Sequence, residues 1–298
     1  MENNASLKIS YRQKNTTVCP VCGTEFYKEE LFSGGGRLIA GALSEELRRL
    51  YEDNKKFGKI CPLAYQLTVC PACLFTAYQK DFVELSASEL DKMKSLTPAR
   101  KNAIVKYFGN IDFNDDRNLM SGAASYMLAI DCYGIRNKKV APTFKNAVSA
   151  IRAAWLFNDL SAEKPDRPYK KMSQFFYKKA YGYYMLILEY VQNGAEPADA
   201  AGNMGPDTDK NWGYDGILYL AAVLTVKVAG LDPDINMRIE NFEKSKKYLS
   251  RLFGMGKTTK NRPTELLDKT KALYEKINQM LDEWYIETGK KAEEELPS

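Results

Sequence analysis

The 298-residue chain contains no histidine. This absence excludes catalytic dyads and triads with an imidazole base, and it excludes imidazole ligands at a metal site. The run of three glycines, Gly34–Gly36, is not followed by the Lys-Ser/Thr of a phosphate-binding loop, so we interpret it as a turn. With neither a nucleophile–base pair nor a cofactor fingerprint in the sequence, we expect a protein that is not an enzyme.

Long apolar runs are also missing. The most apolar stretch, residues 216–228, spans 13 positions and is interrupted by Thr225 and Lys227. A helix needs about 20 apolar residues to cross a bilayer, and the first 15 residues of the chain lack the apolar core of a secretory signal. We therefore expect a cytoplasmic protein without membrane insertion. The net charge of +5 is too small to indicate nucleic acid unless the cations gather in one patch.

Two Cys-x-x-Cys pairs are the most informative feature that is present. Cys19 and Cys22 form the first pair, and Cys70 and Cys73 form the second. Four thiolates complete a closed tetrahedral zinc site, and a reducing cytosol favours metal over disulfides. The pattern predicts one structural Zn²⁺ per chain. Cys61 is a further thiol nearby, which we interpret as a half-buried residue of the same module rather than an extra ligand.

Short alternating segments flank both cysteine pairs. The approach at 17–18, the exit at 25–27 and the run at 65–69 are typical of small β-hairpins. They favour a small zinc-ribbon-like β module over residues 1–82. The long insert between the pairs has a helical pattern at 44–54, where we expect a helix.

From residue 83 onward the apolar spacing is helical. Ser86 and Glu89 fit a capping box, and Pro98 follows Thr97 as it would at a helix start. We expect helices over residues 97–108, 117–133, 143–160, 169–192, 214–229, 235–253 and 263–288. Successive pairs of this size predict a mainly α protein, with a TPR-like array of antiparallel helical hairpins over 83–289 and a flexible polar tail at 290–298.

In combination, several motifs resemble the DUF2225 family of uncharacterised bacterial proteins. The motifs are Val-Cys-Pro-Val-Cys-Gly-Thr-Glu-Phe at 18–26, Pro-Leu-Ala-Tyr-Gln-Leu-Thr-Val-Cys-Pro-Ala-Cys at 62–73, Asp-Phe at 81–82, and the helical segments 124–133 and 152–157. The resemblance covers most of the chain. It implies a Cys-x-x-Cys-bearing N-terminal module joined to a TPR-like helical region, with no assigned activity.

The second cysteine pair departs from the family pattern. There the cysteines are usually followed by Gly-Tyr, and in this chain by Leu74 and Phe75. A glycine at the first of these positions adopts a positive φ without strain. We therefore expect Leu74 to strain the turn or alter it, while all four sulfurs stay in place.

The predicted function is a non-enzymatic, zinc-stabilised protein-interaction scaffold. Stacked helix pairs form extended grooves, so we expect a helical groove that binds a protein or peptide partner. Asn146, Arg152 and Tyr177 are the candidate partner-binding residues.

Two alternatives stay open. One is a nucleic-acid-binding zinc ribbon in which Lys and Arg side chains of residues 14–59 contact phosphates, although acidic residues are interspersed among them. The other is a thiol or redox enzyme that uses Cys61 beside the metal.

Overall fold

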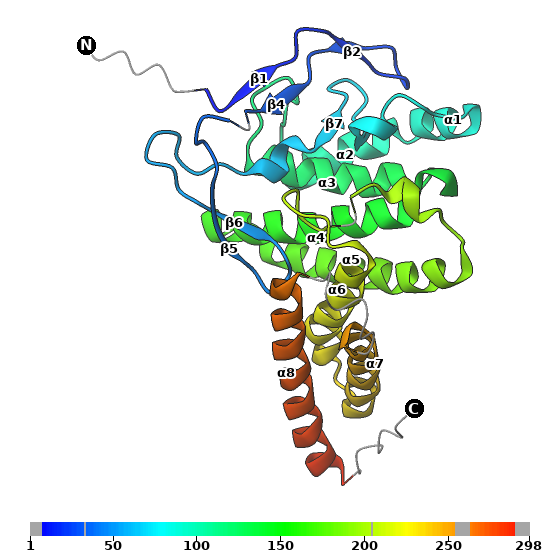
Figure 1. The fold of residues 1–298 in the computed structure, drawn as a ribbon. Helices are drawn as coiled ribbons and strands as arrows, with labels where there is room; N and C mark the ends of the chain where they lie inside the picture. The colour runs from blue at the N-terminus through cyan, green and yellow to red at the C-terminus, as the bar shows by residue number, and fades with distance from the viewer. Residues whose placement is uncertain (1–7, 33, 204, 254–262, 290–298) are drawn as a thin grey trace. The chain divides into compact units, whose positions relative to one another are not determined.

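The computed structural model describes residues 8–32, 34–203, 205–253 and 263–289. Within these residues the protein is mainly helical, as predicted, with eight α-helices and four two-stranded antiparallel sheets (Figure 1). The chain divides into two compact units, residues 1–210 and 211–298. The domain boundary expected after residue 82 falls inside the first unit. The predicted tail at 290–298 lies outside the described residues, and the TPR-like arrangement of the helices stays a prediction.

The four strand pairs all lie within residues 10–78. The pairs are β1 (Ser10–Arg12) with β4 (Glu29–Leu31), β2 (Thr17–Val18) with β3 (Glu25–Phe26), β5 (Ile39–Leu43) with β6 (Arg49–Glu52), and β7 (Leu67–Val69) with β8 (Thr76–Tyr78). Most strands have only two to four residues. Isolated strand pairs this short are marginal in water, so each must be held by packing or by a cross-link.

Five helices complete the first unit. They are α1 (Ala87–Ser95), α2 (Thr97–Phe108), α3 (Leu119–Tyr133), α4 (Pro142–Glu163) and α5 (Tyr169–Asn193), with short 3₁₀ turns that include η1 (Pro62–Tyr65). The capping box predicted at Ser86 and Glu89 is present at the start of α1. Helix α3 packs on α4, and α4 packs on α5. The helix boundaries lie within a few residues of those expected from capping and apolar spacing.

We call the N-terminal segment that carries both cysteine pairs, residues 8–32 and 34–82, the cysteine module. Helix α3 can approach this module closely because Gly122 has no side chain. A Cβ atom at this position would lie 2.9 Å from the Cα atom of Ala64 in η1. Next to this contact, the Tyr126 hydroxyl donates a hydrogen bond to the carbonyl of Leu63 at 2.9 Å. The segment between the cysteine pairs is therefore anchored on α3 by backbone contact as well as by side chains.

The helix expected at 44–54 is wrong, because this segment forms the tip and second strand of the β5–β6 hairpin. Tertiary contacts override the helical propensity at the tip. Glu46 accepts hydrogen bonds from the Trp155 indole and, at 2.8 Å, from the Tyr177 hydroxyl. Leu47 is fully buried with φ +58°, and Arg48 forms a bidentate ion pair with Asp159. We call residues 44–48 the hairpin tip.

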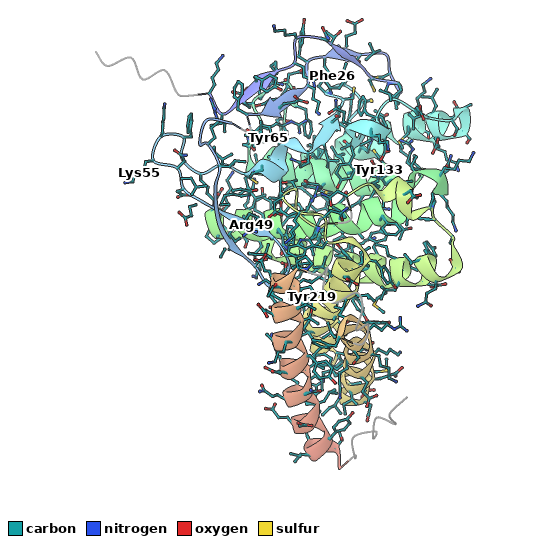
Figure 2. The ribbon with its side chains drawn as sticks, viewed as in Figure 1. Phe26, Arg49, Lys55, Tyr65, Tyr133 and Tyr219 are labelled. Atoms are coloured by element: carbon teal, nitrogen blue, oxygen red, sulfur yellow. The ribbon has the colours of Figure 1, made fainter. Side chains whose placement is uncertain are left out.

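A network of charged groups is buried between the cysteine module and the helices. It includes Tyr133, which is labelled in Figure 2. The Asp81 carboxylate accepts hydrogen bonds from the Tyr133 hydroxyl at 2.6 Å and from the Lys145 ammonium at 2.7 Å. Arg136 donates to the Asp81 carbonyl at 2.9 Å and pairs with Glu89 at 3.1 Å. Buried charges persist only where they are paired, so this network fixes how 78–89 docks on α3 and α4.

The second unit consists of α6 (Gly213–Val228), η5 (Ala229–Leu231), α7 (Ile235–Phe253) and α8 (Thr264–Thr288). The segment Gly213–Leu231 is long and apolar enough to cross a membrane by composition alone. Its side chains are largely buried against α7 and α8, as in the core helix of a helical bundle. Among the described residues, no other helix passes this test of length and composition.

Candidate metal centre

Each cysteine pair sits in the turn that joins two strands. Cys19 and Cys22 lie between β2 and β3, and Cys70 and Cys73 lie between β7 and β8. In each turn the amide four residues after the first cysteine donates to that cysteine's carbonyl at 2.9 Å, and the first cysteine's own amide donates back across the turn at 2.9 Å. The two turns, which we call the first and second knuckle, are therefore equivalent in backbone hydrogen bonding.

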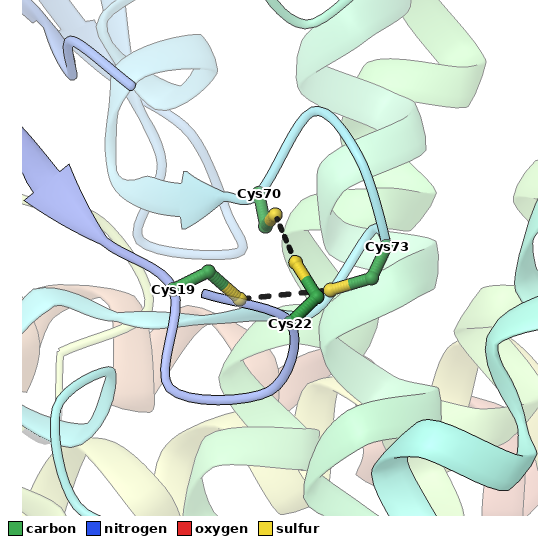
Figure 3. Close-up of side chains that lie close together, drawn as sticks. All are labelled: Cys19, Cys22, Cys70 and Cys73. Carbon is green, nitrogen blue, oxygen red and sulfur yellow. Dashed lines mark hydrogen bonds between the residues drawn. The ribbon is translucent and has the colours of Figure 1, made fainter. Parts of the chain in front are cut away.

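The knuckles bring the four sulfurs together (Figure 3). Cys19 and Cys73 sulfurs are 3.6 Å apart, Cys22 and Cys70 sulfurs are 3.5 Å apart, and all four lie within 4.8 Å of one another. A tetrahedral zinc site with Zn–S bonds of about 2.3 Å has S–S edges of about 3.8 Å. The predicted ligands thus have the spacing that one tetrahedral metal ion requires. No sulfur pairs in a disulfide, since all six cysteines are free thiols.

The backbone prepares the first cysteine of each pair to be a thiolate. Amides of Val21 and Cys22 donate to the Cys19 sulfur, and the equivalent pair in the second knuckle donates to the Cys70 sulfur; each bond lowers the cysteine's pKa. Metal binding needs deprotonated sulfurs, so these amides assist it.

The sulfurs also influence one another. The hydrogen bond between Cys19 and Cys70 lowers the pKa of Cys70 and raises the pKa of Cys19. The pKa of Cys73 is raised in the same way by its hydrogen bond with Cys19. Without a cation, one thiolate is thus stabilised at the expense of its neighbours. A divalent metal ion would offset the repulsion between neighbouring thiolates and allow all four sulfurs to deprotonate.

Side chains from two helices hold the second knuckle in place. The buried Arg100 guanidinium of α2 donates to the Cys73 carbonyl at 3.3 and 3.2 Å and to the Met93 carbonyl at 2.7 Å. From α3, the Cys132 sulfur accepts a hydrogen bond from the Thr76 amide at 3.4 Å. The sequence analysis missed Arg100, because nothing in a helical Arg marks it as a partner of a distant turn.

Leu74 adopts the conformation that a glycine would take without strain. Its φ is +60°, and the equivalent residue of the first knuckle, Gly23, has φ +75°. The turn has the same conformation as the first knuckle, so Leu74 does not alter it. The positive φ is strained for a leucine, as expected. The Leu74 side chain is buried, whereas a Cβ added at Gly23 would meet nothing within 4 Å.

The two knuckles should therefore respond differently to substitution. We expect Gly23→Ala to lower the free energy of unfolding by about 1 kcal/mol, because it adds backbone strain without packing. We expect Leu74→Gly also to destabilise, by about 1 to 2 kcal/mol, because the lost apolar burial exceeds the relieved strain. Urea denaturation of the metal-loaded variants measures both, and a more stable Leu74→Gly protein would contradict the packing argument.

Cys61 lies outside the cysteine cluster. It borders a separate pocket of about 490 Å³ that Arg48 and Asp159 also line. Burial raises the pKa of the Cys61 thiol to about 11, although the nearby Arg48 lowers it. A thiol with a raised pKa is protonated at neutral pH and is a weak nucleophile.

The three candidate partner-binding residues do not line an open groove. Asn146 and Arg152 of α4 are each 5% exposed, and Arg152 donates to the Pro206 carbonyl at 2.6 Å and lies over the Tyr126 ring. Tyr177 of α5 is half-buried and donates to Glu46 of the hairpin tip. In these positions, Asn146 and Arg152 belong to the interior and do not reach a partner at the surface.

A different part of the helical surface is hollow. A groove of about 690 Å³ runs between α3 and α5, and Leu96 and Tyr107 also line it. Its walls come from one face of each helix, at helical spacing: Met127, Ile130 and Asp131 of α3 with Gly134 just after its end, and Met172, Phe175, Phe176, Lys179 and Tyr183 of α5. Phe176 stacks on Phe157 of α4 with ring centroids 5.3 Å apart, so α4 supports the groove from below.

A family model matches residues 12–277, which include both knuckles and most of the helices. It describes uncharacterised proteins conserved in bacteria, the DUF2225 family. This chain belongs to that family. An uncharacterised protein of Borreliella burgdorferi is 41% identical over 271 residues, which cover 91% of this chain and 97% of the relative. No solved structure matches this DUF2225 chain at a significant level.

The structure assigns roles to the motifs on which the resemblance to DUF2225 proteins rested. The segments at 18–26 and 62–73 carry the knuckles and η1, and Asp81 holds the buried charge network. The helical segment 124–133 supplies Tyr126 and Cys132, which dock the cysteine module on α3. In this DUF2225 protein the motifs therefore mark the contacts between the cysteine module and the helices.

Proposed function

We propose that the protein is a non-enzymatic, zinc-stabilised protein-interaction scaffold. The observation that carries this proposal is the closed cluster of four cysteine sulfurs at tetrahedral spacing. Such a ligand set leaves no coordination position for water or substrate, whereas catalytic zinc keeps one open. A metal held there would supply folding energy rather than chemistry.

The donor set supports zinc as the metal. Four thiolates with no oxygen or imidazole donor disfavour magnesium and calcium, which prefer oxygen ligands. Zinc and iron both accept four thiolates in tetrahedral geometry. Zinc agrees better with a structural role, because it has no redox chemistry.

The interaction part of the proposal rests on the groove between α3 and α5. Its lining is mainly apolar, and Phe175 leaves 53% of its surface exposed there. Grooves of this kind between helices are common docking sites for peptide segments.

The two alternative functions have less support. Two of the arginines expected to contact phosphates in a nucleic-acid-binding ribbon are engaged with acidic groups, Arg48 with Asp159 and Arg49 with Asp209. A thiol enzyme would need an activated cysteine outside the metal site, and burial raises the pKa of Cys61.

Native mass spectrometry with elemental analysis tests the proposal. Protein purified without added metal should carry one zinc per chain, and Cys70→Ser should abolish metal retention. Crosslinking in native cells should recover a defined protein partner in near-stoichiometric amount. A metal-free or iron-loaded protein with a redox signal, or stoichiometric recovery of RNA or DNA, would overturn the proposed function.

A further inference from the structure

We propose that the groove between α3 and α5 binds an amphipathic helix of a partner protein, with carboxylates flanking its apolar stripe. This inference rests on the proposed interaction function and names the class of partner. It depends on the shape of the groove, on the apolar surface left exposed and on the charge of the helices that line it.

The shape fits a helix. On the α3 side, Ile130, Asp131 and Gly134 follow Met127 at intervals of three, four and seven. On α5, Phe175, Phe176 and Lys179 follow Met172 at the same intervals. Two such parallel stripes leave a channel between them, which is the form that receives the apolar face of a third helix. The flexible side chains of Met127 and Met172 can adapt to the side chains of a ligand.

Within the first unit, part of the apolar surface of the groove stays exposed. Phe175 is 53% exposed and Tyr107 is 39% exposed, although both line the groove. Soluble proteins rarely leave a contiguous apolar surface open without a binding role. A partner helix would bury these rings, which are of the type that most often dominates binding energy.

The charge around the groove is positive. Lys171 and Lys179 line it, and Asp131 is the one carboxylate among its lining residues. Asp131 already lies 4.0 Å from Arg100. This excess of cations is complementary to an acidic partner and would repel a basic one.

Two lysines at the groove itself set the expected spacing of the partner's carboxylates. Lys171 and Lys179 both line the groove and are eight positions apart on α5, about 12 Å along the helix axis. A partner helix that lies along the groove should place two Asp or Glu residues about seven or eight positions apart, one at each lysine. The mainly apolar lining favours the apolar face of a helix. Because aromatic rings beside lysines are also a platform for base stacking, the test includes single-stranded nucleic acid.

Fluorescence anisotropy with the full-length, metal-loaded protein tests the inference. The probes are labelled peptides of about 16 residues with one apolar stripe, carrying either glutamates or lysines eight positions apart, and a scrambled glutamate peptide. We expect the glutamate peptide to bind at least about tenfold more tightly than the other two. A labelled single-stranded oligonucleotide serves as a further competitor.

Matched variants locate the binding site. Lys171→Glu with Lys179→Glu should weaken binding of the glutamate peptide about tenfold or more, whereas Lys170→Glu with Lys178→Glu makes the same charge change on α5 outside the groove and should leave it nearly unchanged. Phe175→Ser should weaken binding about tenfold, and the exposed Val105→Ser on α2 should not. Metal content and thermal unfolding show whether each variant is folded.

Three results would overturn the inference. If the glutamate peptide binds but neither groove variant weakens it, the groove is not the site, although the interaction function would stand. If the lysine peptide binds as tightly as the glutamate peptide, or if the oligonucleotide displaces both, the assigned partner chemistry is wrong. If no peptide binds while crosslinking recovers a protein partner, the assignment of the groove as a helix-binding site is wrong. The proposed interaction function would then stand.

Discussion

Metal removal is expected to unfold the first knuckle and to loosen the second, while α4 and α5 stay folded. The β2–β3 pair has only two residues in each strand, too few to persist without a cross-link. Binding of zinc by zinc-finger peptides is worth about 10–16 kcal/mol, most of which appears as folding free energy. Chelation, or Cys19→Ser, should therefore abolish amide protection in the first knuckle.

The two knuckles should differ in how much protection they lose. The second knuckle keeps its bonds to Arg100 and Cys132 when the metal leaves, and the first knuckle has no equivalent bond to either residue. Hydrogen exchange measured by mass spectrometry, with and without chelator, should show protection lost at 17–26 and only reduced at 67–78. Cys61→Ser is the control, because it removes a thiol outside the cluster and should change neither metal content nor protection. Equal protection in metal-free and metal-loaded protein would show that the metal has no structural role.

Loss of the Asp81 carboxylate should destabilise the protein by about 3–5 kcal/mol. Asp81→Ala leaves the Lys145 ammonium in the interior without a counter-charge and deprives the Tyr133 hydroxyl of its acceptor. The rings of Tyr78 and Tyr133, within 6.0 Å of the ammonium, compensate for only part of this loss.

A second substitution separates the unpaired charge from the lost contacts. Lys145→Met added to Asp81→Ala removes the buried cation, so the double variant should recover a large share of the stability that Asp81→Ala loses. Urea unfolding of the two single variants and the double variant measures the coupling. If the double variant were less stable than Asp81→Ala by the full cost of Lys145→Met alone, the two groups would not be coupled and the argument would fail.

The sequence predicted the cluster of four cysteines and most helices because both signals are local. A Cys-x-x-Cys turn holds two sulfurs together whatever surrounds it, and the capping box at Ser86 and Glu89 starts a helix by bonds within four residues. Because one tetrahedral metal site needs four ligands, two such pairs in one chain are expected to come together. Nothing in such signals depends on the rest of the fold.

The predictions that failed depended on contacts between distant residues. The segment at 44–54 has helical propensity, yet Glu46 and Arg48 bond to side chains more than 100 positions away and fold it into a hairpin. Arg152 was expected to bind a partner in a helical groove, but the Pro206 carbonyl and the Tyr126 ring accommodate it in the interior. The groove also depends on packing, because the sequence shows that Met127 and Ile130 are apolar but only the structure shows that they are partly buried.

The separation of the two knuckles along the chain also bears on how the protein is made. Cys22 and Cys70, which meet at the metal site, are 48 positions apart. At about 5–20 residues per second, the second knuckle leaves the ribosome roughly 2–10 s after the first. Until then Cys19 and Cys22 form an incomplete site, exposed to oxidants and to competing metals. Translation thus sets the earliest moment of metal capture, which comes before α4 and α5 have been synthesised.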